Sequence, residues 1–369
     1  MNTIKSSANN YFPALTGVRA IAAYMVYLHH YLPFGEEMKG SVVYDFFAEF
    51  HVGVTIFFVL SGFLIAYRYS DLTNFSFRKY MVNRFARIYP MYFIITTLAF
   101  LFDINLSLDF EFLKTPTLYL FNISFIKGFY SGHKFTGIPQ GWSLTVEECF
   151  YIFAPLIFFC LRKSMNFLII FPIILYSIGV CMVKISQILS TSFFGSYDFM
   201  FIYTFFGRCA EFFIGIILAV IFKKGNRRPS FKHFTYTGIF LMIFFIYLLS
   251  AIKGNNDTGI RLPLGKVINT FFLPLFGIAT FFYGLLTEKT IVSRILETKL
   301  FVLLGKSSYI FYLAHMGIVS AIMWRFMPNF LFFFFPGYIL GFLGLIVTSI
   351  VLFYCIEEPL NNFLRKKLA

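Results

Sequence analysis

The sequence has too few charged residues to cover the surface of a soluble protein. Of its 369 residues, 13% are Asp, Glu, Lys or Arg, whereas 59% are hydrophobic and 22% are aromatic. A soluble core cannot bury so many aromatic side chains behind so small a polar surface. The composition therefore excludes a soluble enzyme, a disordered tail and a secreted disulfide module, and it is typical of a polytopic membrane protein.

A cysteine pattern and a polar basic domain are also missing. The five cysteines lie in apolar segments without a CxxC motif or a Cys/His spacing, which indicates neither a disulfide framework nor a metal site. The net charge is +14 (31 basic minus 17 acidic residues), yet no stretch combines basic density with a polar, foldable domain. We therefore expect no nucleic-acid partner, and we interpret the excess charge as a sign of membrane topology.

Ten apolar runs are long enough to cross a bilayer as helices. The predicted fold is all-α: one membrane domain, residues 1–369, with about ten transmembrane helices around a central cavity. No internal repeat, low-complexity tract or appended soluble domain is visible. The runs cover residues 14–34, 50–69, 88–103, 146–161, 167–183, 205–222, 235–252, 268–287, 307–324 and 335–355.

Basic residues are divided unevenly between the two sets of connections. The set that contains both ends of the chain holds 21 of the 31 Lys and Arg residues, and the rest of the chain holds 10 (31 minus 21). Because basic residues near helix ends are retained in the cytoplasm, we expect both termini there and the longest external segment at 104–145. The first run is too long for a signal-peptide core and carries Arg19 and His30, so we expect it to remain as a helix.

Ionisable side chains within membrane helices are costly and usually line a cavity or a reaction path. Arg19 and His30 are eleven residues apart, which places them on one helical face about 16 Å from each other. His29 is turned away from that face by about 80°. The spacing indicates a functional His30 with Arg19 as its companion, but an interfacial anchor explains a histidine near a helix end equally well.

The next two runs carry small residues and then arginines. Gly53, Ser61 and Gly62 interrupt an otherwise bulky surface, which favours close helix packing over substrate contact. Arg84 and Arg87 are three residues apart and share one helical face. Their guanidinium groups suit the phosphates of a nucleotide-like ligand. They also suit lipid headgroups and cytoplasmic retention, which the local sequence favours.

Glu147 and Glu148 stand at the start of the fourth run. Thr145 and Glu148 have the spacing of a capping box, which accounts for one of the two carboxylates. Glu147 lies about 100° away around the helix and is left free to face a cavity.

Polar residues recur in two later runs. Arg208 and Glu211 are three residues apart within apolar sequence, which favours mutual neutralisation. Ser308, Tyr312 and His315 form a polar stripe that either contacts substrate or holds helices together.

Seven short motifs follow one another over residues 15–360. They are LTGVRAIAAYMVYLHH with Arg19 and His30; Phe57-Phe58 with Ser61-Gly62-Phe63; Arg84, Arg87-Ile88 and Pro90; Trp142-Ser143-Leu144 with Glu147; Arg208, Glu211-Phe212 and Gly215; Leu304-Gly305, Ser308-Tyr309, Tyr312-Leu313 and His315; and Ile356-Glu357 with Pro359. Each motif is weak alone, but together and in this order they resemble those of the acyltransferase-3 family, whose members are bacterial integral membrane enzymes that O-acylate surface glycans and some antibiotics.

The resemblance implies a membrane-embedded O-acyltransferase of the bacterial inner membrane. Its donor would be acyl-CoA, usually acetyl-CoA, bound from the cytoplasmic side. Its acceptor would be a hydroxyl of a surface or lipid-linked saccharide, and membrane lipids would be its other partners. No resident cofactor or metal is implied, and the chain resembles stand-alone members that lack an SGNH esterase-like domain.

The resemblance also implies roles for individual residues. His30 would act as a general base or as a transient covalent acyl carrier, with Arg19 as its companion. Glu147 would orient the imidazole or the sugar, and Arg84 and Arg87 would contact the donor. The other matched polar residues are candidates for the substrate cavity: Ser61, Trp142, Ser143, Arg208, Glu211, Tyr312 and His315.

Two other classes share the helix count and the basic balance. A flippase or polymerase of lipid-linked saccharides needs no CoA site, and a flippase would show repeats that are not apparent here. A structural membrane protein has no reason to place Arg19, His30 and Glu147 within apolar helices.

Overall fold

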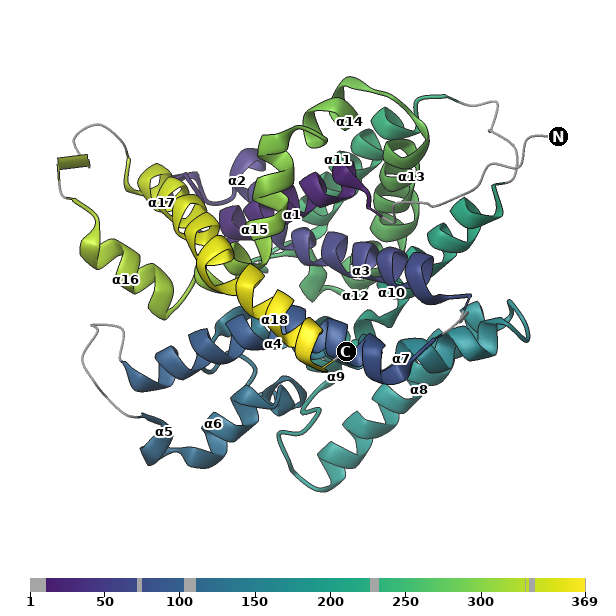
Figure 1. Cartoon of the computed structure of the whole chain (residues 1–369), viewed down its shortest axis with the longest axis horizontal. Coiled ribbons are helices and arrows are strands. Elements are labelled where there is room, and N and C mark those ends of the chain that lie inside the picture. Colours follow the sequence, from purple (N-terminus) through teal and green to yellow (C-terminus); the bar gives the residue numbers. More distant parts are fainter. Residues whose placement is uncertain are drawn as a thin grey trace.

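The computed structural model describes residues 11–71, 75–102, 111–225, 232–328, 330–331 and 336–368. Within these ranges the chain forms helices joined by links and contains no strand, which confirms the predicted all-α fold for the described part (Figure 1). Residues 103–110 of the predicted external segment and residues 226–231 of a predicted cytoplasmic link lie outside the described residues.

The helices differ widely in length. In chain order the α-helices are α1 (Pro13–His30), α2 (Val42–Ala48), α3 (Gly53–Tyr69), α4 (Phe77–Leu101), α5 (Glu111–Lys114), α6 (Pro116–Ile123), α7 (Trp142–Leu161), α8 (Phe167–Ile188), α9 (Tyr197–Tyr203), α10 (Phe205–Lys224), α11 (Phe234–Ile252), α12 (Pro263–Val267), α13 (Ala279–Thr287), α14 (Ile291–Leu296), α15 (Lys299–Ala314), α16 (Ile318–Phe326), α17 (Gly337–Leu352) and α18 (Glu358–Leu368). Two π-helical stretches, η6 (Ile268–Ile278) and η8 (Phe353–Glu357), continue into α13 and α18.

Seven helical segments of the described chain are long and apolar enough to cross a membrane, and α15 with α16 supplies an eighth if the bent pair counts as one span. The protein is therefore a polytopic membrane protein. Two of the ten predicted runs, those of α1 and α4, are absent from this set. Both helices carry arginines (Arg19 in α1, Arg84 and Arg87 in α4), which lower their mean hydropathy.

The structure corrects two predicted boundaries. The third run was expected to begin at residue 88, but α4 begins at Phe77, where the Ser76 side chain caps the amide of Lys79. Arg84 and Arg87 therefore lie inside a helix rather than in a link. The ninth run was expected to be one helix over 307–324, but the chain bends by 99° between α15 and α16. Gly317 permits this turn because it adopts a positive φ of 85°.

The centre of the molecule consists of α1, α3, α10 and α15, which pack closely on one another (Figure 1). Glycine makes these approaches possible. A Cβ atom at Gly62 of α3 would overlap the carbonyl oxygen of Phe212, and one at Gly215 of α10 would overlap that of Val59. Gly305 of α15 meets the carbonyl oxygen of Thr16 in the same way. The predicted packing role of Gly62 is thus confirmed.

Gly62→Ala is expected to destabilise the protein, because the added methyl group must push α3 and α10 apart. Overpacking of this kind costs about 1–3 kcal/mol of unfolding free energy. Thermal unfolding in nanodiscs measures the loss as a lower midpoint. Gly132→Ala is the matched control, since a Cβ at that exposed glycine meets nothing within 4 Å. Equal midpoints for the two variants would contradict the packing argument.

Candidate functional site

Three cavities follow one another along α1 and α3. We name them the basic cavity (about 280 Å³), the middle cavity (about 70 Å³) and the histidine cavity (about 620 Å³). Along α3 they are lined in turn by Ile65, Phe57 and Val54, and His51 in the 3₁₀ turn before α3 lines the last of them. Along α1 they are lined by Arg19 and then by His30. The two helices run antiparallel and pack on each other, so the cavities succeed one another along both of them. We call this series of cavities the passage.

The basic cavity collects positive charge. Its described lining residues include five cationic side chains and no acidic one. Because like charges repel, such a cluster is favoured where water, a nearby carboxylate such as Glu357 or an anionic ligand screens it. The five are Arg19, Arg68, Arg84, Arg87 and Lys306.

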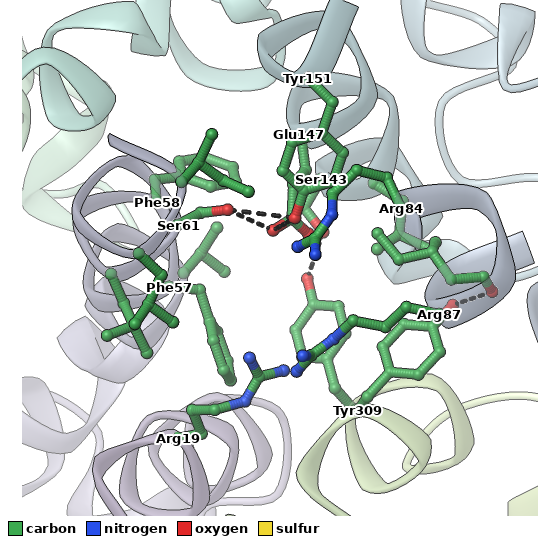
Figure 2. A pocket seen from close by; sticks show the side chains of 17 residues that line it. Arg19, Phe57, Phe58, Ser61, Arg84, Arg87, Ser143, Glu147, Tyr151 and Tyr309 are labelled. Carbon is green, nitrogen blue, oxygen red and sulfur yellow. Dashed lines mark hydrogen bonds between the residues drawn. The ribbon is translucent and has the colours of Figure 1, made fainter. Parts of the chain in front are cut away.

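Three of these arginines also line the middle cavity. Figure 2 shows the guanidinium groups of Arg19, Arg84 and Arg87 pointing into it from two helices, with Glu147 across the cavity from Arg19. The Nε atoms of Arg19 and Arg84 are buried and have no hydrogen-bond partner among the described residues. Buried donors of this kind are normally satisfied, so the arrangement has room for an acceptor that a ligand would bring.

Glu147 is held by two hydroxyl groups. The Ser61 hydroxyl donates to Glu147 Oε1 at 2.6 Å, and the Tyr151 hydroxyl donates to the same oxygen (Figure 2). Ser61 and Tyr151 also contact each other at 3.1 Å, and the Arg84 guanidinium lies 5.7 Å from the centre of the Tyr151 ring. Glu147 therefore faces a cavity, as predicted, and its carboxylate is oriented by neighbours from α3 and α7.

The proposed cap at Glu148 is wrong. Helix α7 begins at Trp142, several residues before the predicted start, so Glu147 and Glu148 lie in its second turn. The Thr145 hydroxyl donates to the carbonyl of Phe125 at 2.8 Å and caps nothing. A short 3₁₀ turn, Pro139–Gly141, leads directly into the helix, so the helix starts upstream of the apolar run.

Four histidines gather at the other end of the passage. The ring centre of His30 lies 4.7 Å from that of His29 and 5.4 Å from that of His315, and His29 lies 5.5 Å from His51. His51 Nε2 contacts the buried carboxylate of Glu49 at 3.0 Å. His315 is fully buried behind His30, so the cavity itself is lined by the other three rings.

His29 and His30 have different environments. His29 Nδ1 donates to the carbonyl of Ala48 at 2.6 Å, which fixes its ring. His30 makes ring contacts only: within the described residues neither of its nitrogens has a hydrogen-bond partner. It is exposed to the cavity at the end of α1. Of the pair, His30 is therefore the one whose nitrogens are available to a ligand.

Four of the remaining candidates line these cavities. Ser143 lines the middle cavity, Trp142 lines the histidine cavity, and Tyr312 lines both. Arg208 lines the histidine cavity but makes a two-pronged ion pair with Glu211, whose closest contact is 2.7 Å, and donates to the Thr55 hydroxyl at 3.0 Å. The predicted neutralisation of this buried pair is confirmed.

The structure adds residues that the sequence reasoning missed. Tyr151 follows Glu147 by four positions, a helical spacing that could have identified it. Gln140 could not be found in this way: its side-chain amide donates to the carbonyls of Tyr312 and Leu313, at 2.8 and 2.9 Å, across 172 residues of sequence.

Lys127 supports the segment that carries Gln140. It is fully buried outside the spans, and its ammonium donates to the carbonyls of Thr136 and Ile138, at 2.6 Å each. Burial lowers the pKa of Lys127 to about 7. Because burial of a lysine side chain is costly, its two hydrogen bonds indicate that the link before α7 has one preferred conformation.

Comparison with known proteins places this architecture in a family. The model of the acyltransferase-3 family, described as an acyltransferase domain, matches residues 12–357. No solved structure matches the chain.

Three relatives carry names with the qualifier "putative". An O-acetyltransferase of Staphylococcus aureus is 25% identical over 333 residues, which cover 84% of this chain and 51% of that protein. A peptidoglycan O-acetyltransferase of Bacillus subtilis is 31% identical over 168 residues, 41% of this chain and 24% of the relative. An acetyltransferase of Acidianus two-tailed virus is 30% identical over 149 residues, 40% and 41% of the two chains.

This chain thus spans about half the length of the staphylococcal relatives. The family match, in contrast, covers every residue that lines the three cavities except Tyr11, and it contains the motif residues from Arg19 to Glu357. The chain therefore belongs to the acyltransferase-3 family of membrane O-acyltransferases.

Proposed function

We propose that the protein transfers an acyl group, in the simplest case acetyl, from acyl-CoA in the basic cavity to a saccharide hydroxyl in the histidine cavity. The main support for the proposal is the passage along α1 and α3. It has a cluster of cations at one end and, at the other, the imidazole of His30, which has no hydrogen-bond partner among the described residues. We do not propose a flippase or polymerase of lipid-linked saccharides, because the chain belongs to a family of acyltransferases.

The donor end suits a CoA thioester. CoA carries phosphates on a nucleotide and a thin pantetheine arm. Guanidinium groups bind phosphate through paired hydrogen bonds, and the buried Nε atoms of Arg19 and Arg84 are available for them. With its phosphates held in the basic cavity, the donor can extend its arm through the middle cavity toward His30, which is about 16 Å along α1 from Arg19.

The acceptor end suits a saccharide. The histidine cavity is the largest of the three, and aromatic and polar side chains share its wall. Aromatic faces such as Trp142 and Tyr203 pack on sugar rings, while Asp257, Thr258 and Arg261 offer hydrogen bonds to hydroxyl groups. The name of the Bacillus subtilis relative, a peptidoglycan O-acetyltransferase, agrees with this class of acceptor.

His30 supplies the chemistry in this proposal. Its neutral imidazole takes the proton of the acceptor hydroxyl as the oxygen attacks the thioester carbonyl. The C–O bond forms, the C–S bond breaks, and the proton passes to the departing sulfur to give the CoA thiol. A covalent route through acyl-His30 is the alternative. We favour the base, because one positioned imidazole is sufficient for direct transfer.

The proposed orientation puts the basic cavity in the cytoplasm and both termini on that side of the bacterial inner membrane. The basic cavity is lined by Arg68 of α3, Arg84 and Arg87 of α4 and Lys306 of α15, all from stretches of sequence that the distribution of basic residues assigns to the cytoplasm. The histidine cavity includes Arg261, from a connection assigned to the outside.

Arg87→Ala is expected to weaken the binding of acetyl-CoA roughly 5- to 150-fold, because a lost guanidinium–phosphate contact costs about 1–3 kcal/mol. Titration of the purified protein in nanodiscs measures this affinity. Arg162→Ala is the control, since that exposed arginine lines none of the three cavities. Unchanged binding by both variants would make Arg87 a topological anchor only.

His30→Ala is expected to abolish acetyl transfer while acetyl-CoA still binds, because the base acts only in the chemical step. Transfer of radiolabelled acetyl to the glycan fraction of the host envelope measures activity, with His133→Ala as a histidine control outside the cavities. Wild-type protein supplied with labelled donor alone separates the mechanisms. Label that remains on the wild type but not on the His30→Ala variant would replace the general base with a covalent acyl carrier.

Single cysteines at Asn255 and Lys163, both exposed, are expected to react from opposite sides of the membrane when the native cysteines are replaced. An impermeant maleimide applied to intact spheroplasts should label the cysteine at 255 and spare the one at 163. Labelling of both from outside would refute the proposed topology without affecting the assignment to the family.

A further inference from the structure

The middle and histidine cavities are separated by very little protein. They share two lining residues, Val54 of α3 and Tyr312 of α15. The basic and middle cavities, in contrast, share five, including all three arginines. On the proposed function, the donor side therefore comprises the first two cavities, and the boundary with the acceptor side lies at Val54 and Tyr312.

Tyr312 is fixed in this boundary position from several directions. Its hydroxyl is 2.7 Å from the Ser143 hydroxyl of α7, and its ring packs edge-on against Phe57 at 5.8 Å between centres. Its carbonyl accepts hydrogen bonds from Gln140 and from His315 Nδ1, at 2.8 Å each. The side chain is 6% exposed even though it faces two cavities.

The chemistry gives such a barrier a purpose. Water and an acceptor hydroxyl are similar nucleophiles, and water is far more abundant. Water that reached the thioester would form a C–O bond to the acyl carbon and release the CoA thiol, which yields free acetate and a proton. Enzymes that handle reactive acyl donors suppress this loss by keeping water out until the acceptor is in place.

We propose that Tyr312 determines the specificity of the enzyme for its acceptor over water. In the arrangement described, its ring separates a thioester in the middle cavity from the solvent in the histidine cavity. Two hydrogen bonds join the tip of this ring to the neighbouring wall: the Tyr312 hydroxyl contacts the Ser143 hydroxyl at 2.7 Å and donates to the carbonyl of Gln140 at 3.4 Å. An acceptor in the histidine cavity can contact Tyr312 directly, so its binding can displace the ring at the time of transfer. This inference rests on the proposed function.

The test measures hydrolysis of acetyl-CoA in the absence of any saccharide. The full-length chain in nanodiscs receives radiolabelled acetyl-CoA, and free acetate and CoA thiol are followed together. We expect slow release by the wild type and release at least tenfold faster by Tyr312→Ala. Tyr312→Phe keeps the ring and should stay within about threefold of the wild type. Phe213→Ala removes another buried ring, one that lines none of the three cavities, and it should not accelerate hydrolysis.

Val54→Ala shortens the other side chain at this boundary, on α3. It replaces Tyr312→Ala as the test variant if Tyr312→Ala does not fold. Unaccelerated hydrolysis by a folded variant that binds acetyl-CoA would overturn the inference, as would equal acceleration by Phe213→Ala. Failure of the proposed function has a different signature, since the wild type would then neither bind acetyl-CoA nor acetylate the envelope glycan fraction.

Discussion

The rest of the structure depends on the free-energy cost of placing charged side chains among apolar helices. Three guanidinium groups and one carboxylate meet at the middle cavity, where a charge without a partner is strongly destabilising. Glu147 is stabilised by Ser61 and Tyr151, whereas Arg19 and Arg84 keep buried Nε donors without partners among the described residues. Arg208 and Glu211 show the alternative solution, a closed ion pair. The first group has the unmet hydrogen-bonding capacity expected of a binding site, and the second does not.

Close helix packing makes that charged group possible. Gly62 and Gly215 bring α3 against α10, and Gly305 brings α15 against α1. The antiparallel helices α1 and α3 then run side by side along the passage, with Arg19 at one end and His30 at the other. Any larger side chain at the three glycines would change the spacing of the helices, and with it the width of all three cavities.

Sequence reasoning succeeded where a helical period alone fixes geometry. It placed Arg19 and His30 on one wall, Arg84 and Arg87 on one face, and Arg208 beside Glu211. It failed where a boundary depends on contacts distant in sequence. The apolar run gave no sign that α7 starts at Trp142, or that the chain turns by 99° after Ala314. The hydrogen bond from Gln140 to Tyr312 could not be predicted either, because no local sequence pattern connects two residues that are 172 positions apart.

The serial arrangement of the cavities has a consequence for energetics. Proteins that carry whole substrates across a membrane alternate between two openings, and many achieve this with a pair of repeated halves. In the proposed route only a small acyl group crosses, while CoA and saccharide stay on their own sides. The thioester bond itself then supplies the driving force, without an ion gradient or a rocking motion. A single non-repeated bundle with a short fixed passage is sufficient for that task.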